Sequence, residues 1–135
     1  MRQDWPPPWI TFDSAANYGF TEVCKWLRNN VCCERSFKQP QLYLWGKPNL
    51  GKTTLVNELA KYLSVYVACN DENFMDLYDD EECQLVVWDE FKGQRPVTFM
   101  NQFLQGGVMT LRIKGGQVLK RNNVPVLILS NYRDP

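Results

Sequence analysis

Four short runs of apolar residues divide the chain, and helical patterns lie between them. The apolar runs lie near residues 41–45, 64–69, 84–88 and 124–130. Each is short and rich in Val, Leu, Ile or aromatic residues, which predicts buried strands. Apolar positions at three- and four-residue spacing predict helices near residues 20–32, 52–63 and 97–104, and a shorter helix near 73–78 is also considered. Strands that alternate with helices predict an α/β fold, in which a mostly parallel central sheet lies between outer layers.

A glycine-rich loop follows the first predicted strand. Residues 46–54 read Gly-Lys-Pro-Asn-Leu-Gly-Lys-Thr-Thr, which matches the P-loop pattern of a glycine, four residues and Gly-Lys-Thr. A strand before the loop and a helix after it are the setting that this motif requires. The predicted nucleotide-binding residues are Gly46, Lys47, Pro48, Asn49, Leu50, Gly51, Lys52, Thr53 and Thr54.

The residue types in this loop suit a triphosphate. Gly46 and Gly51 allow the backbone to curl so that successive amide groups point at phosphate oxygens. Lys52 would add a positive charge near the β- and γ-phosphates, and Thr53 would offer its hydroxyl to Mg²⁺. The helix that begins here would turn its positive end toward the anion. The loop therefore predicts binding of a nucleoside triphosphate with Mg²⁺.

Two later strands end in polar residues that fit the same chemistry. Asp89 and Glu90 follow the strand near 84–88, and Asn131 follows the strand near 124–130. Open α/β sheets bind ligands at the carboxyl ends of their strands. Asp89 is placed to hold Mg²⁺, Glu90 to orient or deprotonate the attacking water, and Asn131 to bond the γ-phosphate or that water. The alternatives are a solvated loop position for Glu90 and a turn-forming role for Asn131.

A β-hairpin is predicted before the last of these strands. Two glycines separate two alternating runs, which is typical of a tight hairpin. Lys114 would lie at or beside the tip, and basic side chains along the arms could bind a phosphate backbone. The predicted DNA-binding residues are Arg112, Lys114, Gly115, Gly116 and Lys120. The alternative is a basic hairpin that faces only solvent.

Composition narrows the chemistry further. The chain of 135 residues contains no histidine, which excludes Ser-His triads, histidine metal ligands and histidine general bases. The five cysteines contain no Cys-x-x-Cys pair and are expected to be reduced thiols in an intracellular protein. No apolar stretch has the length of a membrane span and no signal peptide is visible, so no membrane partner is expected.

Charge and domain organisation point to a compact core with a polyanionic partner. The net charge is zero, but residues 71–90 carry nine acidic and no basic side chains, whereas residues 91–135 carry seven basic side chains and one acidic. The acidic segment is most simply a solvated surface, and the basic final third suggests a polyanion. We expect a linker and a helical segment in residues 1–40 and the core in 41–135. A Trp-Pro-Pro-Pro-Trp run makes residues 2–12 look extended and linker-like.

In this order the motifs resemble those of a superfamily 3 helicase domain of the AAA+ class. The resemblance rests on Gly46–Thr54, Val86–Phe91, Ile113–Gly116 and Leu127–Asn131. It is strong from about residue 41 to 131 and is greatest to the replication initiators (Rep) of circovirus-like viruses with circular single-stranded DNA. It is weaker over residues 10–40, whose helix resembles the oligomerisation segment ahead of the ATPase core, so the resemblance implies a linker and helical oligomerisation segment in residues 1–40. It implies a three-layer P-loop ATPase that hydrolyses ATP and moves 3′ to 5′ along single-stranded DNA as a homohexameric ring, with the host nucleus as its location.

The same resemblance assigns roles to residues. It implies that Lys52 contacts the phosphates of ATP and that Thr53 and Asp89 hold Mg²⁺. It also implies that Glu90 activates water and that Asn131 senses the γ-phosphate. These roles agree with those that the residue chemistry suggests by itself.

The resemblance is incomplete, and other functions remain open. Lys114 would lie in the segment that places basic residues in the central pore of the ring. The family's upstream nickase domain is absent, and the chain stops four residues after Asn131, before the family's arginine finger. We therefore expect an excised fragment that is truncated at its carboxyl end. The alternatives are a superfamily 3 ATPase of an RNA virus, another P-loop NTPase, or an oligomerising nucleic-acid-binding module that does not hydrolyse ATP.

Overall fold

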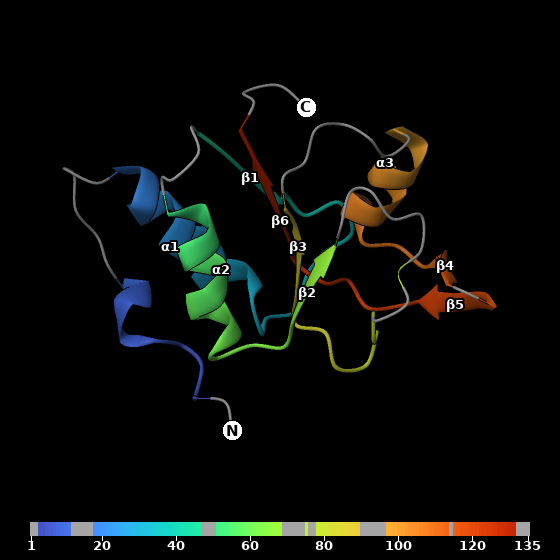
Figure 1. The fold of residues 1–135 in the computed structure, drawn as a ribbon, viewed down its shortest axis with the longest axis horizontal. Helices are drawn as coiled ribbons and strands as arrows, with labels where there is room; N and C mark the ends of the chain where they lie inside the picture. The colour runs from blue at the N-terminus through green and yellow to red at the C-terminus, as the bar shows by residue number, and fades with distance from the viewer. Residues whose placement is uncertain are drawn as a thin grey trace.

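A four-stranded parallel sheet forms the centre of the molecule (Figure 1). The computed structural model describes residues 3–11, 18–46, 51–68, 75, 78–89, 97–113 and 115–131. The strands of the sheet are β1 (Leu42–Trp45), β2 (Val65–Ala68), β3 (Leu85–Trp88) and β6 (Val126–Ser130). They lie in the order β1-β6-β3-β2, and every neighbouring pair is parallel. This confirms the predicted α/β class with a mostly parallel central sheet.

The two inner strands are apolar along their whole lengths because both faces of the sheet are covered. Every residue of β3 and β6 is buried. Parallel sheets with two covered faces characteristically have such continuous apolar strands. The outer strands are less enclosed, since Trp45 of β1 is 53% exposed and Val67 of β2 is 47% exposed. Successive side chains of β3 and β6 therefore supply two separate cores, one on each face.

Three helical elements cover the first face, and Figure 1 shows them together on one side of the sheet. They are the 3-10 helix η1 (Pro8–Thr11) and the helices α1 (Tyr18–Asn30) and α2 (Lys52–Ala60). Their apolar residues pack with Leu85, Val87 and Leu127 of the sheet in one core cluster. The P-loop helix α2 is therefore held in place because one of its faces is buried against the central sheet.

The amino-terminal segment belongs to this core, so the expectation of an extended linker in residues 2–12 was wrong for the residues that the structure describes. Ile10 is only 1% exposed. Its carbonyl accepts a hydrogen bond from Arg28 Nη1 at 2.7 Å, and Gln3 N donates to the carbonyl of Lys61 at 2.9 Å. Trp5 and Trp9 pack against the same cluster. Burial of these apolar side chains opposes the extended solvated chain that the prolines alone suggest.

A helix and a hairpin cover the second face, on the opposite side of the sheet in Figure 1. They are α3 (Val97–Gln105) and the antiparallel pair β4 (Met109–Ile113) and β5 (Gly116–Lys120). Phe103 of α3 is fully buried and meets Trp88 of β3 edge to face, with ring centroids 5.6 Å apart. Such edge-to-face pairs add to the stability that burial of the rings provides.

Most predicted elements are present within a few residues of their expected ends. The helix expected over 52–63 ends earlier, at Ala60, because the chain then tightens and Tyr62 N and Leu63 N both donate to the Leu59 carbonyl at 3.0 Å. The short helix considered near 73–78 lies largely outside the described residues, of which Met75 and Tyr78 are not helical. In the described part of the chain, no helix is both long enough and apolar enough to cross a membrane.

Candidate nucleotide-binding site

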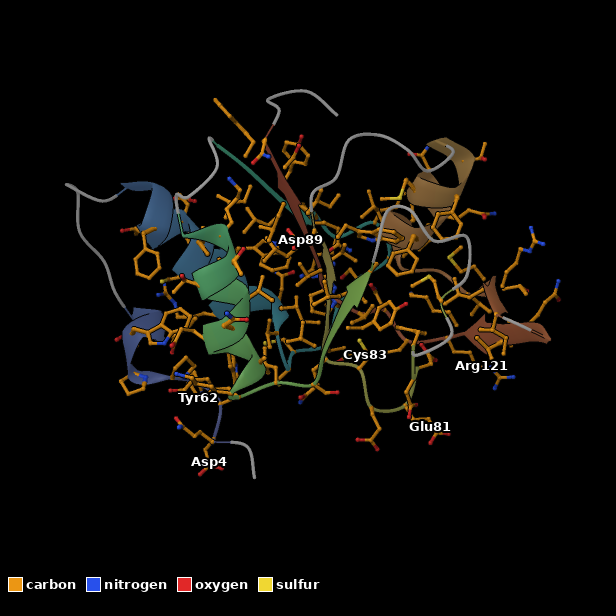
Figure 2. All side chains as sticks on the ribbon, viewed as in Figure 1. Asp4, Tyr62, Glu81, Cys83, Asp89 and Arg121 are labelled. Carbon is orange, nitrogen blue, oxygen red and sulfur yellow. The ribbon has the colours of Figure 1, made fainter. Side chains whose placement is uncertain are left out.

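The predicted site residues gather at the carboxyl ends of three neighbouring strands. Gly46 follows β1, Asn131 follows β6 and Asp89 follows β3. Because β6 lies between β1 and β3, these three positions lie within two strand spacings of one another across the sheet, with Asp89 level with Leu129 and Gly46 level with Asn131. Figure 2 shows Asp89 at this end of the sheet, and Cys83 and Glu81 toward the other end. Chain positions more than 80 residues apart are thus brought to one edge.

The P-loop is anchored at its start by a backbone hydrogen bond. Gly46 N donates to the carbonyl of Ser130, the last residue of β6, at 3.1 Å. Ser130 is 1% exposed and lies opposite Trp45 in the sheet register. The start of the loop is therefore fixed beside Asn131, which is itself exposed.

The far end of the loop has the geometry of an anion-binding helix terminus. Gly51 has φ +88° and ψ 12°, a left-handed conformation that glycine adopts with least strain, and no side chain caps α2. The first amide groups of the helix thus have no capping side-chain oxygen. Lys52 Nζ donates to the Gly46 carbonyl at 2.9 Å, so the lysine joins the two ends of the loop. Amide groups, the helix dipole and a lysine together suit a phosphate chain.

The residues at this edge also fit Mg²⁺. Thr53, in the first turn of α2, is exposed, and Asp89 is half-buried at the end of β3. Both offer hard oxygen ligands, which Mg²⁺ prefers. The described residues contain no group of three or more His, Cys, Asp or Glu side chains that could hold a metal ion. Such a site matches the usual binding of Mg²⁺ through one or two protein ligands, waters and substrate phosphates.

Several predicted site residues lie outside the part of the chain that the structure describes. They are Lys47, Pro48, Asn49, Leu50, Glu90 and Lys114. The geometry therefore bears only on the predicted site residues that the structure describes, and the roles of all the site residues stay predictions.

The predicted hairpin is present, with its turn one residue earlier than the Gly-Gly pair suggested. Ile113 pairs with Gly116, so Gly115 lies in the turn at φ +83° and Gly116 already belongs to β5. Arg112 and Gln117 are cross-strand partners, and both are exposed. The outer face of the hairpin therefore presents Arg112 to solvent, as a DNA contact requires.

The expectation that Lys120 belongs to the DNA-binding surface was wrong. Its side chain is fully buried, with Nζ donating to the Asn122 carbonyl at 2.6 Å and lying 5.1 Å from the centroid of the Phe103 ring. Residues of a strand alternate between faces, so Lys120 shares the inner face with Val118 and not the outer face with Gln117. Burial lowers the pKa of the Lys120 amine. In this position the amine anchors the base of the hairpin and is not presented to DNA.

A pocket beside the P-loop was not predicted from the sequence. It has a volume of about 580 Å³, and Trp9, Phe20 and Trp45 line it together with P-loop residues. The signal lay in the amino-terminal Trp-Pro-Pro-Pro-Trp run, whose prolines suggested a linker although its tryptophans are typical of a packed or ligand-contacting surface.

The fold and the site together define an α/β protein compatible with the P-loop NTPases. A family model described as parvovirus non-structural protein NS1 matches residues 10–133, so the chain belongs to the parvovirus NS1 family. It is 32% identical over 114 residues to the initiator protein NS1 of human parvovirus B19, isolate AU, and equally to that of strain HV.

These matches support the expected relation to a viral initiator at the level of the parvovirus family, and a circovirus-like origin is not shown. Each match covers 81% of this chain and 16% of the relative, so the chain spans about one sixth of the length of these relatives. The family match begins at residue 10 and therefore includes most of the segment that we had separated from the core.

Proposed function

We propose that this chain is the ATPase core of a viral initiator protein and acts as an ATP-dependent DNA helicase domain of superfamily 3. The observation that carries the proposal is the convergence of Gly46, Lys52, Asp89 and Asn131 at one edge of a parallel sheet. The name of the parvovirus relatives, initiator protein, supports a role in the replication of viral DNA.

In this proposal the start of α2 binds the phosphates of ATP. The uncapped amide groups and the dipole of the helix favour the negative charge, and Gly51 keeps the backbone close to it. Lys52 Nζ would exchange its bond to the Gly46 carbonyl for contacts with the β- and γ-phosphates. The bond that Lys52 makes now shows that its amine already reaches across the loop.

Hydrolysis would use the polar ends of β3 and β6. Asp89 and Thr53 would hold Mg²⁺, which when bound neutralises charge that develops on the phosphate oxygens. Glu90, directly after Asp89, would orient the attacking water and take its proton. Asn131 lies on the strand between those of the P-loop and Asp89, and it would bond the γ-phosphate or the water.

The helicase part of the proposal depends on the hairpin and on assembly. Arg112, Lys114, Gly115 of the turn and Gly116 at the start of β5 would contact the backbone of single-stranded DNA. A homohexameric ring would present six such hairpins to the strand. An arginine supplied by a neighbouring subunit commonly completes NTPase sites of this kind and can contribute about 10³–10⁵ in rate. Because the chain spans about one sixth of the length of its relatives, we expect it by itself to bind nucleotide but to assemble weakly and to hydrolyse ATP slowly. The proposed site of action is the host nucleus.

The test separates binding from hydrolysis. Lys52→Ala should abolish binding of Mg-ATP by titration calorimetry, whereas Glu90→Gln should retain binding and lose turnover, because the glutamate is needed only when water attacks. Lys25→Ala is a matched control, since this lysine of α1 is exposed and does not line the pocket beside the P-loop. Equal affinity for ATP in the wild type and Lys52→Ala would refute the P-loop assignment. Binding without any turnover, even in a longer protein with DNA, would favour the non-hydrolysing module.

A further inference from the structure

The pocket beside the P-loop is continuous with the residues that would hold the phosphates. Its volume is about 580 Å³, within the usual range for small-molecule sites. Gly46, Lys52 and Thr54 line it together with the aromatic side chains of Trp9, Phe20 and Trp45. A ligand with its phosphates at the start of α2 would therefore have its remaining part directed toward aromatic side chains.

The aromatic wall is assembled from three separate segments of the chain. Trp9 belongs to η1, Phe20 to α1 and Trp45 to the end of β1. The Trp9 and Phe20 rings are 6.0 Å apart with 31° between their planes. Phe20 is 41% exposed and Trp45 is 53% exposed, although each carries a large apolar surface. Flat aromatic faces that remain accessible in a pocket are suited to stacking on a planar ring.

Within the described lining of the pocket, few side chains could read the edge of a base. Among its described lining residues, the charged side chains are Lys52, which belongs to the phosphate end, and Glu58. The Glu58 carboxylate accepts a hydrogen bond from Lys61 Nζ at 2.8 Å, which occupies part of its capacity. Val23 and Leu44 contribute only apolar surface. Discrimination between bases requires placed donors and acceptors, and stacking alone tolerates any base because every base has a π-face.

We propose that this pocket binds the nucleoside half of the triphosphate by stacking on Trp9, Phe20 and Trp45, and that it discriminates only weakly among the bases. The inference rests on the proposed function, because it assumes that phosphates bind at the start of α2. The three aromatic side chains would recognise the rest of the nucleotide, and purine and pyrimidine triphosphates would all be accepted.

The test compares ligands before it compares variants. Titration calorimetry of the 135-residue chain should show Mg-ATP, Mg-GTP and Mg-CTP binding within about tenfold of one another. Mg-tripolyphosphate, which has no base, should bind on the order of ten- to a hundredfold more weakly than Mg-ATP, the range expected for loss of one base stack. A preference for ATP over both other nucleotides of a hundredfold or more would overturn the inference.

Variants then locate the contact. Trp45→Ala should weaken Mg-ATP binding by about tenfold and leave Mg-tripolyphosphate binding unchanged, since the exposed Trp45 side chain contributes little to the core. Phe37→Ala is the matched control, because Phe37 is 60% exposed and lies against Gly107, outside the pocket. An unchanged affinity for Mg-ATP in Trp45→Ala, or equal loss for both ligands, would overturn the role of this wall.

The outcomes also separate this inference from the proposed function. If the wild type binds tripolyphosphate and ATP equally well, the phosphate site stands and the pocket inference fails alone. If the wild type binds neither ligand, the P-loop assignment fails and the pocket inference fails with it.

Discussion

Replacement of Lys120 tests whether a buried lysine stabilises this fold through its charge or through its alkyl stem. The side chain is fully buried, its Nζ is 2.6 Å from the Asn122 carbonyl, and it lies over the Phe103 ring. A charged hydrogen bond contributes about 1.5–3 kcal/mol and a desolvated cation–π contact about 2 kcal/mol. Removal of one charge from water costs several kcal/mol, which offsets both.

The contribution of the alkyl stem of Lys120 to stability is not offset by a desolvation cost. Lys120→Ala removes three buried methylene groups, which contribute about 0.8 kcal/mol each, or about 2.4 kcal/mol in all before any cavity is counted. Lys120→Met retains most of that apolar volume and loses only the polar head. We therefore expect Lys120→Met to change the free energy of unfolding at neutral pH by less than about 1 kcal/mol, and Lys120→Ala to lower it by about 2–4 kcal/mol.

The pH dependence supplies an independent check. The native pKa of Lys120 is lowered by burial, so above that pKa the unfolded chain binds more protons at this residue than the folded chain does. The contribution of Lys120 to stability therefore rises as the pH increases toward the unfolded value of 10.5. Burial also raises the native pKa of Tyr78 and raises that of Cys83 to about 11, and these two groups lower stability over the alkaline range.

Comparison with Lys120→Met removes the contribution of Tyr78, since both proteins retain that residue. It leaves only the part of the Cys83 contribution that depends on the charge of Lys120, which lowers the pKa of the Cys83 thiol. Urea unfolding followed by tryptophan fluorescence, at pH 7 and at about pH 9.5, should show the wild type gaining stability relative to Lys120→Met at the higher pH. Lys25→Met, at an exposed position of α1, is the control and should show no such gain. The reasoning is refuted if Lys120→Met is as unstable as Lys120→Ala, or if the difference from wild type does not change with pH.

Three further predictions concern the loop, the hairpin anchor and the outer hairpin face. Gly51→Ala should lower the free energy of unfolding by about 1–2 kcal/mol, because φ is +88° there while a Cβ would meet no atom within 4 Å. Gly116→Ala is the control, because a Cβ there also meets no atom within 4 Å but φ is not positive, and it should change the free energy of unfolding by less than about 0.5 kcal/mol. If urea unfolding showed equal losses for both variants, the positive φ of Gly51 would not be the cause. Asp80→Ala should lower the free energy of unfolding by about 2 kcal/mol in the same assay. The Asp80 carboxylate accepts hydrogen bonds from the Tyr78 hydroxyl at 2.8 Å and from the backbone N–H groups of Arg121 and Asn122, which follow β5. An unchanged stability would show that solvent replaces these hydrogen bonds. Arg112→Ala should reduce the slope of log affinity for single-stranded DNA against log salt by about 0.7 per protomer, whereas Lys120→Met should not, and the reverse result would place the buried amine on the DNA.

The sequence predicted the elements better than their arrangement. The strands β3 and β6 were evident because continuous apolar runs are required where both faces of a sheet are covered. That β6 would lie between β1 and β3 was not predicted, because local periodicity does not specify which strands pair. The convergence of Gly46, Asp89 and Asn131 was predicted only in general terms, from the rule that ligands bind at the carboxyl ends of strands.

The two corrections have different physical origins. Lys120 was expected on the surface because lysine is seldom buried, although its alternation with Val118 places it on the inner face. The amino-terminal prolines suggested a linker, but Ile10 and Trp9 bury enough apolar surface to hold the segment on the core. In both cases tertiary packing overrode a preference that residue type alone indicates.

The position of β6 between β1 and β3 also constrains how the protein can fold. Leu42 of β1 pairs with Leu127 of β6, which is 85 positions further along the chain, and β1 has no other strand partner in the described sheet. Pairing over such a distance is slow, because a long loop must close before any contact compensates for the lost entropy. Since Gly46 is held by Ser130 of the same strand, the loop for the phosphates would acquire its shape only when β6 docks. A nucleotide that binds only this completed state would shift the folding equilibrium toward it by mass action, so the ligand would also report on the last stage of folding.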